Sequence, residues 1–187
     1  MKSFKSAMRA FRDDESGLIL AEFVIVLPIL TWAFMALFVY WDIFRSMNTA
    51  QKAAYSISDL ISRQNNDLPA TFITGMGVIM EYLLPPNQSA TMRITSVKWS
   101  TPNNRFEVIW SRSPNNAMPQ LTTATLQPFA PKIPVMAATD TVVIVESSVP
   151  YTPSLNVGLL ASYSLDEFIV TRPRFLTKIC LQGVACT

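Results

Sequence analysis

The sequence predicts an α+β protein in which a long N-terminal membrane-spanning helix is followed by a small antiparallel-sheet domain with one or two further helices. Three observations predict this fold. The segment Gly17–Trp41 is apolar and contains one ionisable side chain, Glu22. A helical pattern of apolar residues continues from there to Arg63. The remainder consists largely of β-branched and aromatic segments separated by proline-rich and asparagine-rich turns.

The segment before the apolar helix, MKSFKSAMRAFRDDES, is basic at its start. Its four basic residues are Lys2, Lys5, Arg9 and Arg12. The stretch that follows the apolar segment, through Asn66, has only Arg45, Lys52 and Arg63. The positive-inside rule therefore predicts a cytoplasmic N-terminus and an exported remainder. We expect a short, solvated leader; the alternative is an amphipathic helix that lies on the inner leaflet through Phe4, Met8 and Phe11.

The segment Gly17–Trp41 is long enough to cross a bilayer, since a helix of this length spans about 37 Å and the hydrocarbon core is roughly 30 Å thick. A carboxylate inside such a helix costs about 2.5–3.5 kcal/mol at mid-bilayer, which makes Glu22 a candidate functional residue. The alternative is that Glu22 stays hydrated near the headgroups. Tyr40 and Trp41 are typical of an interfacial aromatic belt at the outer surface.

In the sequence, Ser16-Gly17 is followed by four apolar residues and then by Glu22-Phe23. This arrangement resembles the N-terminus of the type IV pilin superfamily, most closely the TadE-like pseudopilins of tight-adherence (Tad) pilus systems. The resemblance implies cleavage by a prepilin peptidase between Gly17 and Leu18, which leaves Glu22 as the fifth residue of the mature chain. The chain departs from the family in the acidic residues 13–15, where basic residues are more usual.

Pro28 lies inside the apolar segment and removes one backbone hydrogen bond, so we expect a helix kink near Val24–Pro28. In the pilin superfamily such a proline goes with local melting of the helix during assembly, and the resemblance implies the same here. A secretory signal is disfavoured, because the apolar segment is too long and no small-x-small site closes it. An uncleaved single-pass anchor stays open as an alternative.

The helix is expected to continue beyond the membrane to about Arg63, because residues 42–63 contain neither glycine nor proline. Their apolar seam has spacings of three and four residues and comprises Ile43, Met47, Ala50, Ala54, Ile57 and Ile61. Residues Asn65–Pro69 stop the helix. We expect the outer half of the seam to pack on the chain's own C-terminal domain, and the inner half to be open to helix–helix packing.

The C-terminal domain is predicted to contain a helix at Ala70–Leu84 and a β-hairpin of Thr91–Lys98 and Arg105–Arg112. Trp99 and Trp110, near its ends, are expected to pack rather than to bind a ligand. Residues Ser113–Pro134 are expected to be mostly loop, with a short helix at Gln120–Gln127. The remaining elements are a strand at Thr139–Val149, an apolar connector at Leu155–Leu160 and a strand at Asp166–Arg172. Their order resembles the C-terminal half of TadE-like proteins.

The composition excludes most catalytic and metal sites. The chain has no histidine, which removes Ser–His–Asp and Cys–His sites and the commonest metal ligand. Its two cysteines, Cys180 and Cys186, are too few for structural zinc. In an exported domain they are expected to form a disulfide that ties down a C-terminal tail, and the alternative is a free thiol pair exposed to the cytoplasm in the reverse topology. The carboxylates outside the membrane are scattered: Asp42, Asp59, Asp67, Glu81, Glu107, Asp140, Glu146, Asp166 and Glu167. We therefore expect no enzyme activity, no cofactor and no bound metal. A net charge of +2 without a basic cluster gives no indication of nucleic-acid binding.

The predicted layout is a cytoplasmic leader (1–17), a transmembrane segment (18–41), a helical extension into the periplasm (42–66) and a periplasmic α+β domain (67–187). The resemblance implies an inner-membrane structural pseudopilin with four kinds of partner: a prepilin peptidase, other Tad pseudopilins or pilins, the inner-membrane assembly platform and the membrane itself. Glu22 would then pair with the free amine of Leu18 in a neighbouring subunit. The alternative is an uncleaved single-pass envelope protein whose periplasmic domain binds a partner.

Overall fold

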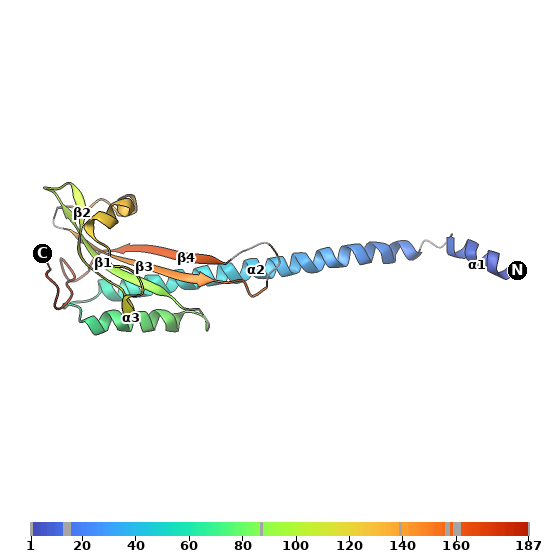
Figure 1. The fold of residues 1–187 in the computed structure, drawn as a ribbon, viewed down its shortest axis with the longest axis horizontal. Helices are drawn as coiled ribbons and strands as arrows, with labels where there is room; N and C mark the ends of the chain where they lie inside the picture. The colour runs from blue at the N-terminus through green and yellow to red at the C-terminus, as the bar shows by residue number, and fades with distance from the viewer. Residues whose placement is uncertain are drawn as a thin grey trace. The chain divides into compact units, whose positions relative to one another are not determined.

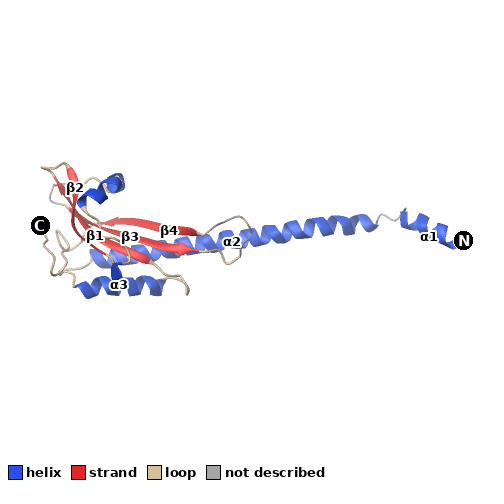
Figure 2. Cartoon of the chain, viewed as in Figure 1, coloured by secondary structure: helices blue, strands red, loops and turns tan. Residues whose placement is uncertain are grey.

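The structure is a computed structural model that describes residues 2–12, 16–86, 88–138, 140–155, 158 and 162–186. For residues 2–5, 7, 16, 18 and 19 it describes the backbone alone. The chain is an α+β protein, with a long N-terminal apolar helix followed by a four-stranded antiparallel sheet and further helices (Figures 1 and 2). It divides into two compact units, Met1–Asp42 with Pro153–Ala161 and Ile43–Thr152 with Ser162–Thr187.

The first unit contains helix α1, Lys2–Arg12, and the first part of helix α2, Ser16–Ser62. Helix α1 has the helical conformation of the amphipathic alternative and its described side chains are exposed, so the choice between a solvated leader and a helix on the leaflet stays a prediction. Helix α2 is continuous through Pro28, and its length of about 70 Å at 1.5 Å per residue agrees with the predicted extended helix.

The second part of α2 belongs to the second unit and buries one face in it. Ala50, Ala54, Ile57 and Ile61 are fully buried, whereas Met47 is 42% exposed. The outer half of the predicted seam therefore packs on the chain's own C-terminal domain, as expected. Helix α3, Ala70–Leu83, matches the predicted second helix to within one residue. It buries one face, made of Ile73, Met76 and Met80.

The four strands form one antiparallel sheet in the order β2-β1-β3-β4. Strands β1, Thr91–Ser100, and β2, Arg105–Arg112, make the predicted hairpin. Asn104 closes its turn with a φ of 48°, a left-handed conformation that asparagine tolerates. A bulge at Ser96/Val97 interrupts the register between β1 and β2.

Strands β3, Thr141–Tyr151, and β4, Tyr163–Thr171, complete the sheet. Thr139, the predicted start of β3, lies outside the described residues, as does most of the predicted connector Leu155–Leu160. The last strand was expected to start at Asp166, which was wrong. Strand β4 begins three residues earlier, at Tyr163, and Tyr163 pairs with Tyr151, the last residue of β3.

Strand β3 was also expected to end before Pro150, but it continues through this proline to Tyr151. The last pair between β1 and β3 is Thr91 with Ser148, so Pro150 has only β4 beside it. The Ser148 carbonyl accepts a hydrogen bond from Thr91 Oγ1 (3.4 Å), so the backbone of Ser148 points toward β1. Backbone groups two residues apart point to the same side. The missing N–H of Pro150 therefore faces the side where β1 has ended, and no ladder bond is lost.

The two faces of the sheet are covered by different segments, and each face has its own core. Helices α2 and α3 cover the first face, where Ile57, Met80, Val145 and Trp110 are buried together. The segment after β2 covers the second face, where Leu126, Val97 and Ile144 are buried (Figure 1).

The covering segment of the second face contains three short helical pieces: η1 (Pro114–Asn116), α4 (Thr123–Leu126) and η2 (Gln127–Lys132). The predicted short helix was expected from Gln120, but Thr122 caps α4 through a capping box with Thr125 and so fixes its start. Thr123 Oγ1 accepts from the Val108 N–H at 3.1 Å, and Gln127 Nε2 donates to the Phe106 carbonyl at 3.0 Å. Side chains of this segment therefore satisfy backbone groups of β2, an edge strand.

Candidate functional site

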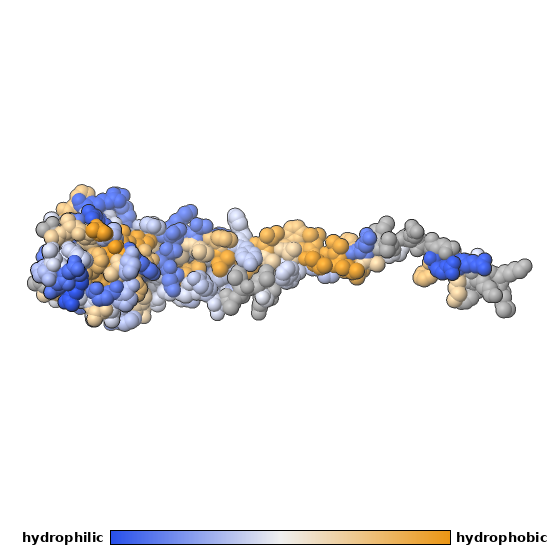
Figure 3. Space-filling model, turned by 90° about the horizontal axis from the view of Figure 1, so that it is seen from above, coloured by the Kyte–Doolittle hydropathy of each residue, from blue (hydrophilic) through white to orange (hydrophobic). Residues whose placement is uncertain are grey.

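The most distinctive surface of the molecule is the N-terminal part of α2. The side chains from Leu20 to Trp41 are largely exposed, and Figure 3 shows much of this part of the chain in the orange of hydrophobic residues. Apart from the buried Val39, the large apolar residues among those described are 44–70% exposed: Leu20, Phe23, Val24, Ile25, Val26, Leu27, Ile29, Leu30, Trp32, Phe34, Met35, Leu37, Phe38, Tyr40 and Trp41. By length and composition, α2 is the one helix of the described residues that could cross a membrane. We call the segment Leu20–Trp41 the apolar stalk.

Glu22 lies near the start of the apolar stalk, and its side chain is exposed. It makes no ion pair with any other described residue. Phe23 beside it is 60% exposed. A carboxylate surrounded by exposed apolar side chains has no internal partner to offset its desolvation in lipid. The arrangement can bind a cation or a protonated amine supplied from outside the chain.

The predicted processing site lies at the start of α2. The helix begins at Ser16, so Gly17 and Leu18 belong to its first turn, and Gly17 is exposed. Residues 13–15, the acidic departure from the family pattern, lie outside the described residues.

Pro28 lies six residues after Glu22 and cannot donate to the Val24 carbonyl. Thr31 Oγ1 donates to the neighbouring Leu27 carbonyl at 2.8 Å. Helix α2 is unbroken at Pro28, and the kink stays a prediction.

The apolar stalk is not exposed along its whole length. Ala36 and Val39, on its C-terminal half, are 8% and 2% exposed. The same unit includes Pro153–Ala161, from which Ser154 Oγ donates to the Asp42 carboxylate at 3.3 Å. Tyr40 and Trp41, the predicted interfacial belt, are 44% and 70% exposed.

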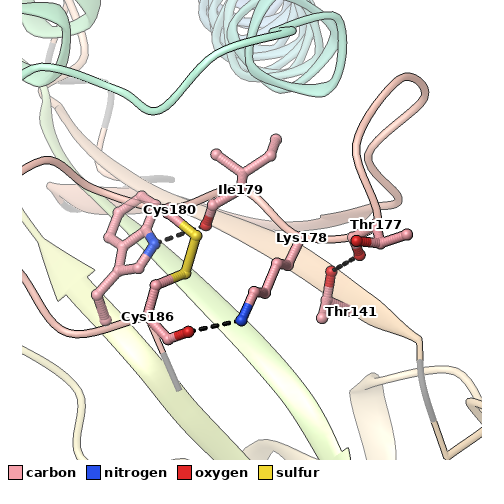
Figure 4. The surroundings of a disulfide bond; sticks show 7 residues. Thr141, Thr177, Lys178, Ile179, Cys180 and Cys186 are labelled. Carbon is pink, nitrogen blue, oxygen red and sulfur yellow. Dashed lines mark hydrogen bonds between the residues drawn. A yellow bond between two sulfur atoms is a disulfide. The ribbon is translucent and has the colours of Figure 1, made fainter.

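The expected disulfide joins Cys180 and Cys186. Figure 4 shows its surroundings, where Lys178 Nζ donates to the Cys186 carbonyl at 2.6 Å and Thr141 Oγ1 donates to the Thr177 carbonyl at 2.7 Å. Ile179, which follows Lys178 in the chain, is fully buried, and its carbonyl accepts a hydrogen bond from Trp110 Nε1 at 2.8 Å.

The C-terminal segment also bonds to the residues that follow α2. The Leu68 N–H donates to the Cys180 carbonyl and the Gln182 N–H donates to the Leu68 carbonyl, both at 2.9 Å. Trp110 is buried and packs in the core, as expected. The segment itself was expected to be a tail held by the disulfide, but it supplies Ile179 and Leu181 to the core.

Three of the described carboxyl groups have a shifted pKa. Ser148 Oγ and Ser164 Oγ each donate to Asp166 at 2.6 Å, which lowers the pKa of this carboxyl and makes it a weak base. Burial raises the pKa of the neighbouring Glu167. The Asn103 amide lowers the pKa of Glu107 on the hairpin. No three metal-ligating side chains gather among the described residues.

A groove that the sequence did not indicate lies beside the β-hairpin. It has a volume of about 470 Å³ and an apolar lining of Trp99, Phe106, Ala130, Pro131, Ile133, Val135 and Met136. Trp99 packs edge-to-face on Phe106, with ring centroids 4.9 Å apart. The hairpin and residues 130–136 are distant in sequence, so no local pattern predicts that they meet.

Comparison of the chain with protein-family models, with curated proteins and with solved structures gave no match.

Proposed function

We propose that this chain is a structural pseudopilin of the TadE-like kind, a single-pass inner-membrane subunit that supports assembly of a Tad-type adhesive pilus. The observation that carries the proposal is the apolar stalk with the lone carboxylate Glu22 near its start, on the same helix that packs into a folded α+β unit. A helix of this kind can anchor the protein in lipid and later exchange lipid for neighbouring helices.

In this proposal, a prepilin peptidase cuts after Gly17 and frees the amine of Leu18. Glu22 pairs with the Leu18 amine of a neighbouring subunit. The two charges then neutralise each other in a medium of low dielectric, where each alone would be costly. Because the pair forms only at one axial offset between two helices, it also fixes their register.

The N-terminus is cytoplasmic and the α+β unit periplasmic in this proposal, as the basic residues before the stalk favour. The disulfide between Cys180 and Cys186 is consistent with export, because disulfides persist in oxidising compartments. The role in this proposal is structural and rests on the apolar stalk and Glu22.

The test is the variant Glu22→Gln, which keeps the shape of the side chain and removes its charge. We expect it to insert normally, because insertion no longer carries a charge, and to lower the amount of surface pili by roughly tenfold or more. The reason is that an amine left without its partner in a low-dielectric interface costs about 3–5 kcal/mol.

The matched control is Glu81→Gln, a neutralised glutamate on the exposed face of α3. Piliation would be measured from the sheared surface fraction and insertion from the membrane fraction. Normal piliation by Glu22→Gln would refute the assigned role of this carboxylate. The competing assignment, an uncleaved single-pass envelope protein, needs neither Glu22 nor removal of residues 1–17.

A further inference from the structure

Helix α1 is amphipathic along its whole length. At about 100° per residue, Phe4, Met8 and Phe11 fall within one arc of the helix. The basic residues Lys2, Lys5, Arg9 and Arg12 fall within the neighbouring arc, and Ser6 lies opposite the apolar arc. No acidic residue interrupts either face. This division of residues is typical of a helix that lies in a membrane interface rather than one that crosses it.

The described side chains of α1 leave the apolar face uncovered. Met8 is 61% and Phe11 86% exposed, and Arg9 on the basic face is exposed as well. Large apolar side chains displayed together on a short helix gain by leaving water. An isolated helix of this length is marginal in water, so a surface that binds its apolar face would also stabilise the helix.

Two features identify the occupant of this face as an anionic lipid surface. The first is charge, because four basic and no acidic residues attract phosphate headgroups. The second is covalent attachment to α2. Arg12 ends α1 and Ser16 begins α2, and four chain steps keep these residues within about 15 Å of each other. A bilayer that holds α2 is therefore always within reach of α1.

We infer that α1 lies flat on the cytoplasmic leaflet, with Phe4, Met8 and Phe11 in the boundary between headgroups and acyl chains and its basic residues against anionic lipid. The inference rests on the membrane insertion of α2 in the proposed function and adds a second, charge-dependent membrane contact. This contact limits the depth to which α2 can sink, and so holds Gly17 and Leu18 at the membrane surface.

The test uses the full, uncleaved chain with its disulfide intact, reconstituted in vesicles. A solvent-sensitive fluorophore is attached at Met8→Cys or, as the matched control on the opposite side of α1, at Ser6→Cys. The vesicles are phosphatidylcholine alone or phosphatidylcholine mixed with phosphatidylglycerol. We expect the Met8 probe to shift to the blue and to be quenched by brominated acyl chains in the mixed vesicles, while the Ser6 probe stays in water.

The double variant Lys5→Gln/Arg9→Gln tests the contribution of charge. Each basic residue near an anionic surface contributes roughly fivefold to partitioning, so this variant should lower the bound-to-free ratio of α1 by about 25-fold. Added salt should weaken the contact of the unmodified helix in the same direction.

Two results would overturn the inference: equal exposure of both probes to water in mixed vesicles, or equal burial of the Met8 probe with and without phosphatidylglycerol. Failure of the pseudopilin proposal is distinguishable, because cleavage after Gly17 is measured separately from lipid contact. A chain that is never cleaved but whose Met8 probe is buried in anionic vesicles would support the lipid contact and refute the processing.

Discussion

A buried ion pair joins two neighbouring strands of the sheet. Arg93 on β1 lies directly opposite Glu146 on β3, and their side chains are 8% and 10% exposed. The contact is bidentate, with Nε to Oε2 at 2.8 Å and Nη2 to Oε1 at 2.7 Å. The remaining arm of Arg93 donates to the Pro119 carbonyl at 2.6 Å. One side chain thus binds a strand and the loop that covers the second face.

Removal of one partner should cost far more than removal of both. We expect Glu146→Ala to lower the free energy of unfolding by about 3–5 kcal/mol, because it leaves the Arg93 guanidinium buried and unpaired. The double variant Arg93→Met/Glu146→Leu should recover most of this loss, since it leaves no buried charge. Urea unfolding of the chain in detergent, followed by tryptophan fluorescence, measures both. A double variant that loses the sum of the two single losses would contradict this account of the pair.

Helix α3 contains two glycines in different surroundings. A Cβ on Gly75 would meet nothing within 4 Å, whereas a Cβ on Gly77 would lie 2.8 Å from Pro114 Cβ. Intrinsic helix propensity makes either glycine unfavourable by about 1 kcal/mol relative to alanine. The close approach of η1 explains why glycine stands at position 77, and propensity alone does not distinguish the two positions.

The two glycine-to-alanine variants should therefore change stability in opposite directions. Gly75→Ala should raise the free energy of unfolding by about 1 kcal/mol through helix propensity. Gly77→Ala should lower it by about 1–3 kcal/mol, because the proline ring is rigid and η1 must move away. Each is the control for the other in the same unfolding experiment. A stabilising Gly77→Ala would show that η1 does not pack as closely as described.

The C-terminal segment links elements that are far apart in the chain. It bonds to the segment between α2 and α3 through Leu68, to β2 through Trp110 and to the start of β3 through Thr141. Ile179 at its centre is fully buried, while the disulfide beside it closes a short loop. Burial of the segment, rather than the covalent bond, should therefore dominate its contribution to stability.

A comparison of two variants tests this ranking. Ile179→Ala should cost about 2–5 kcal/mol, as expected for a cavity at a fully buried aliphatic position. Cys180→Ser/Cys186→Ser should cost about 2 kcal/mol, because a loop this short restricts the unfolded chain only modestly. Thermal or urea unfolding under non-reducing conditions gives both values. A larger loss from the cysteine variant would show that the disulfide, not the core contact, holds the segment.

The elements that were predicted correctly are those with a local pattern. The apolar length of α2, the turn between β1 and β2 and the proline after α3 are encoded by neighbouring residues, and the structure confirms them. The buried outer half of the α2 seam followed from the spacing of its small and branched residues. The disulfide followed from the presence of two cysteines near each other in a domain that was expected to be exported.

The features that sequence reasoning missed depend on contacts between distant segments. Pro150 was expected to end β3, and only the early end of β1 beside it makes the proline acceptable. The pairing of Arg93 with Glu146 requires the register of β1 and β3, which no local pattern gives. The apolar groove requires residues 130–136 to meet the hairpin. The candidate site at Glu22, in contrast, was visible in the sequence because it lies within one helix.

The central claim is that the apolar stalk becomes the N-terminus of a processed pseudopilin, and the most direct measurement is the N-terminal peptide of the protein isolated from membranes. Mass spectrometry would be done on cells with and without the host's prepilin peptidase. The account predicts a chain that begins at Leu18 only when the peptidase is present. A chain that retains residues 1–17 in both strains would contradict it and would identify a permanently anchored envelope protein.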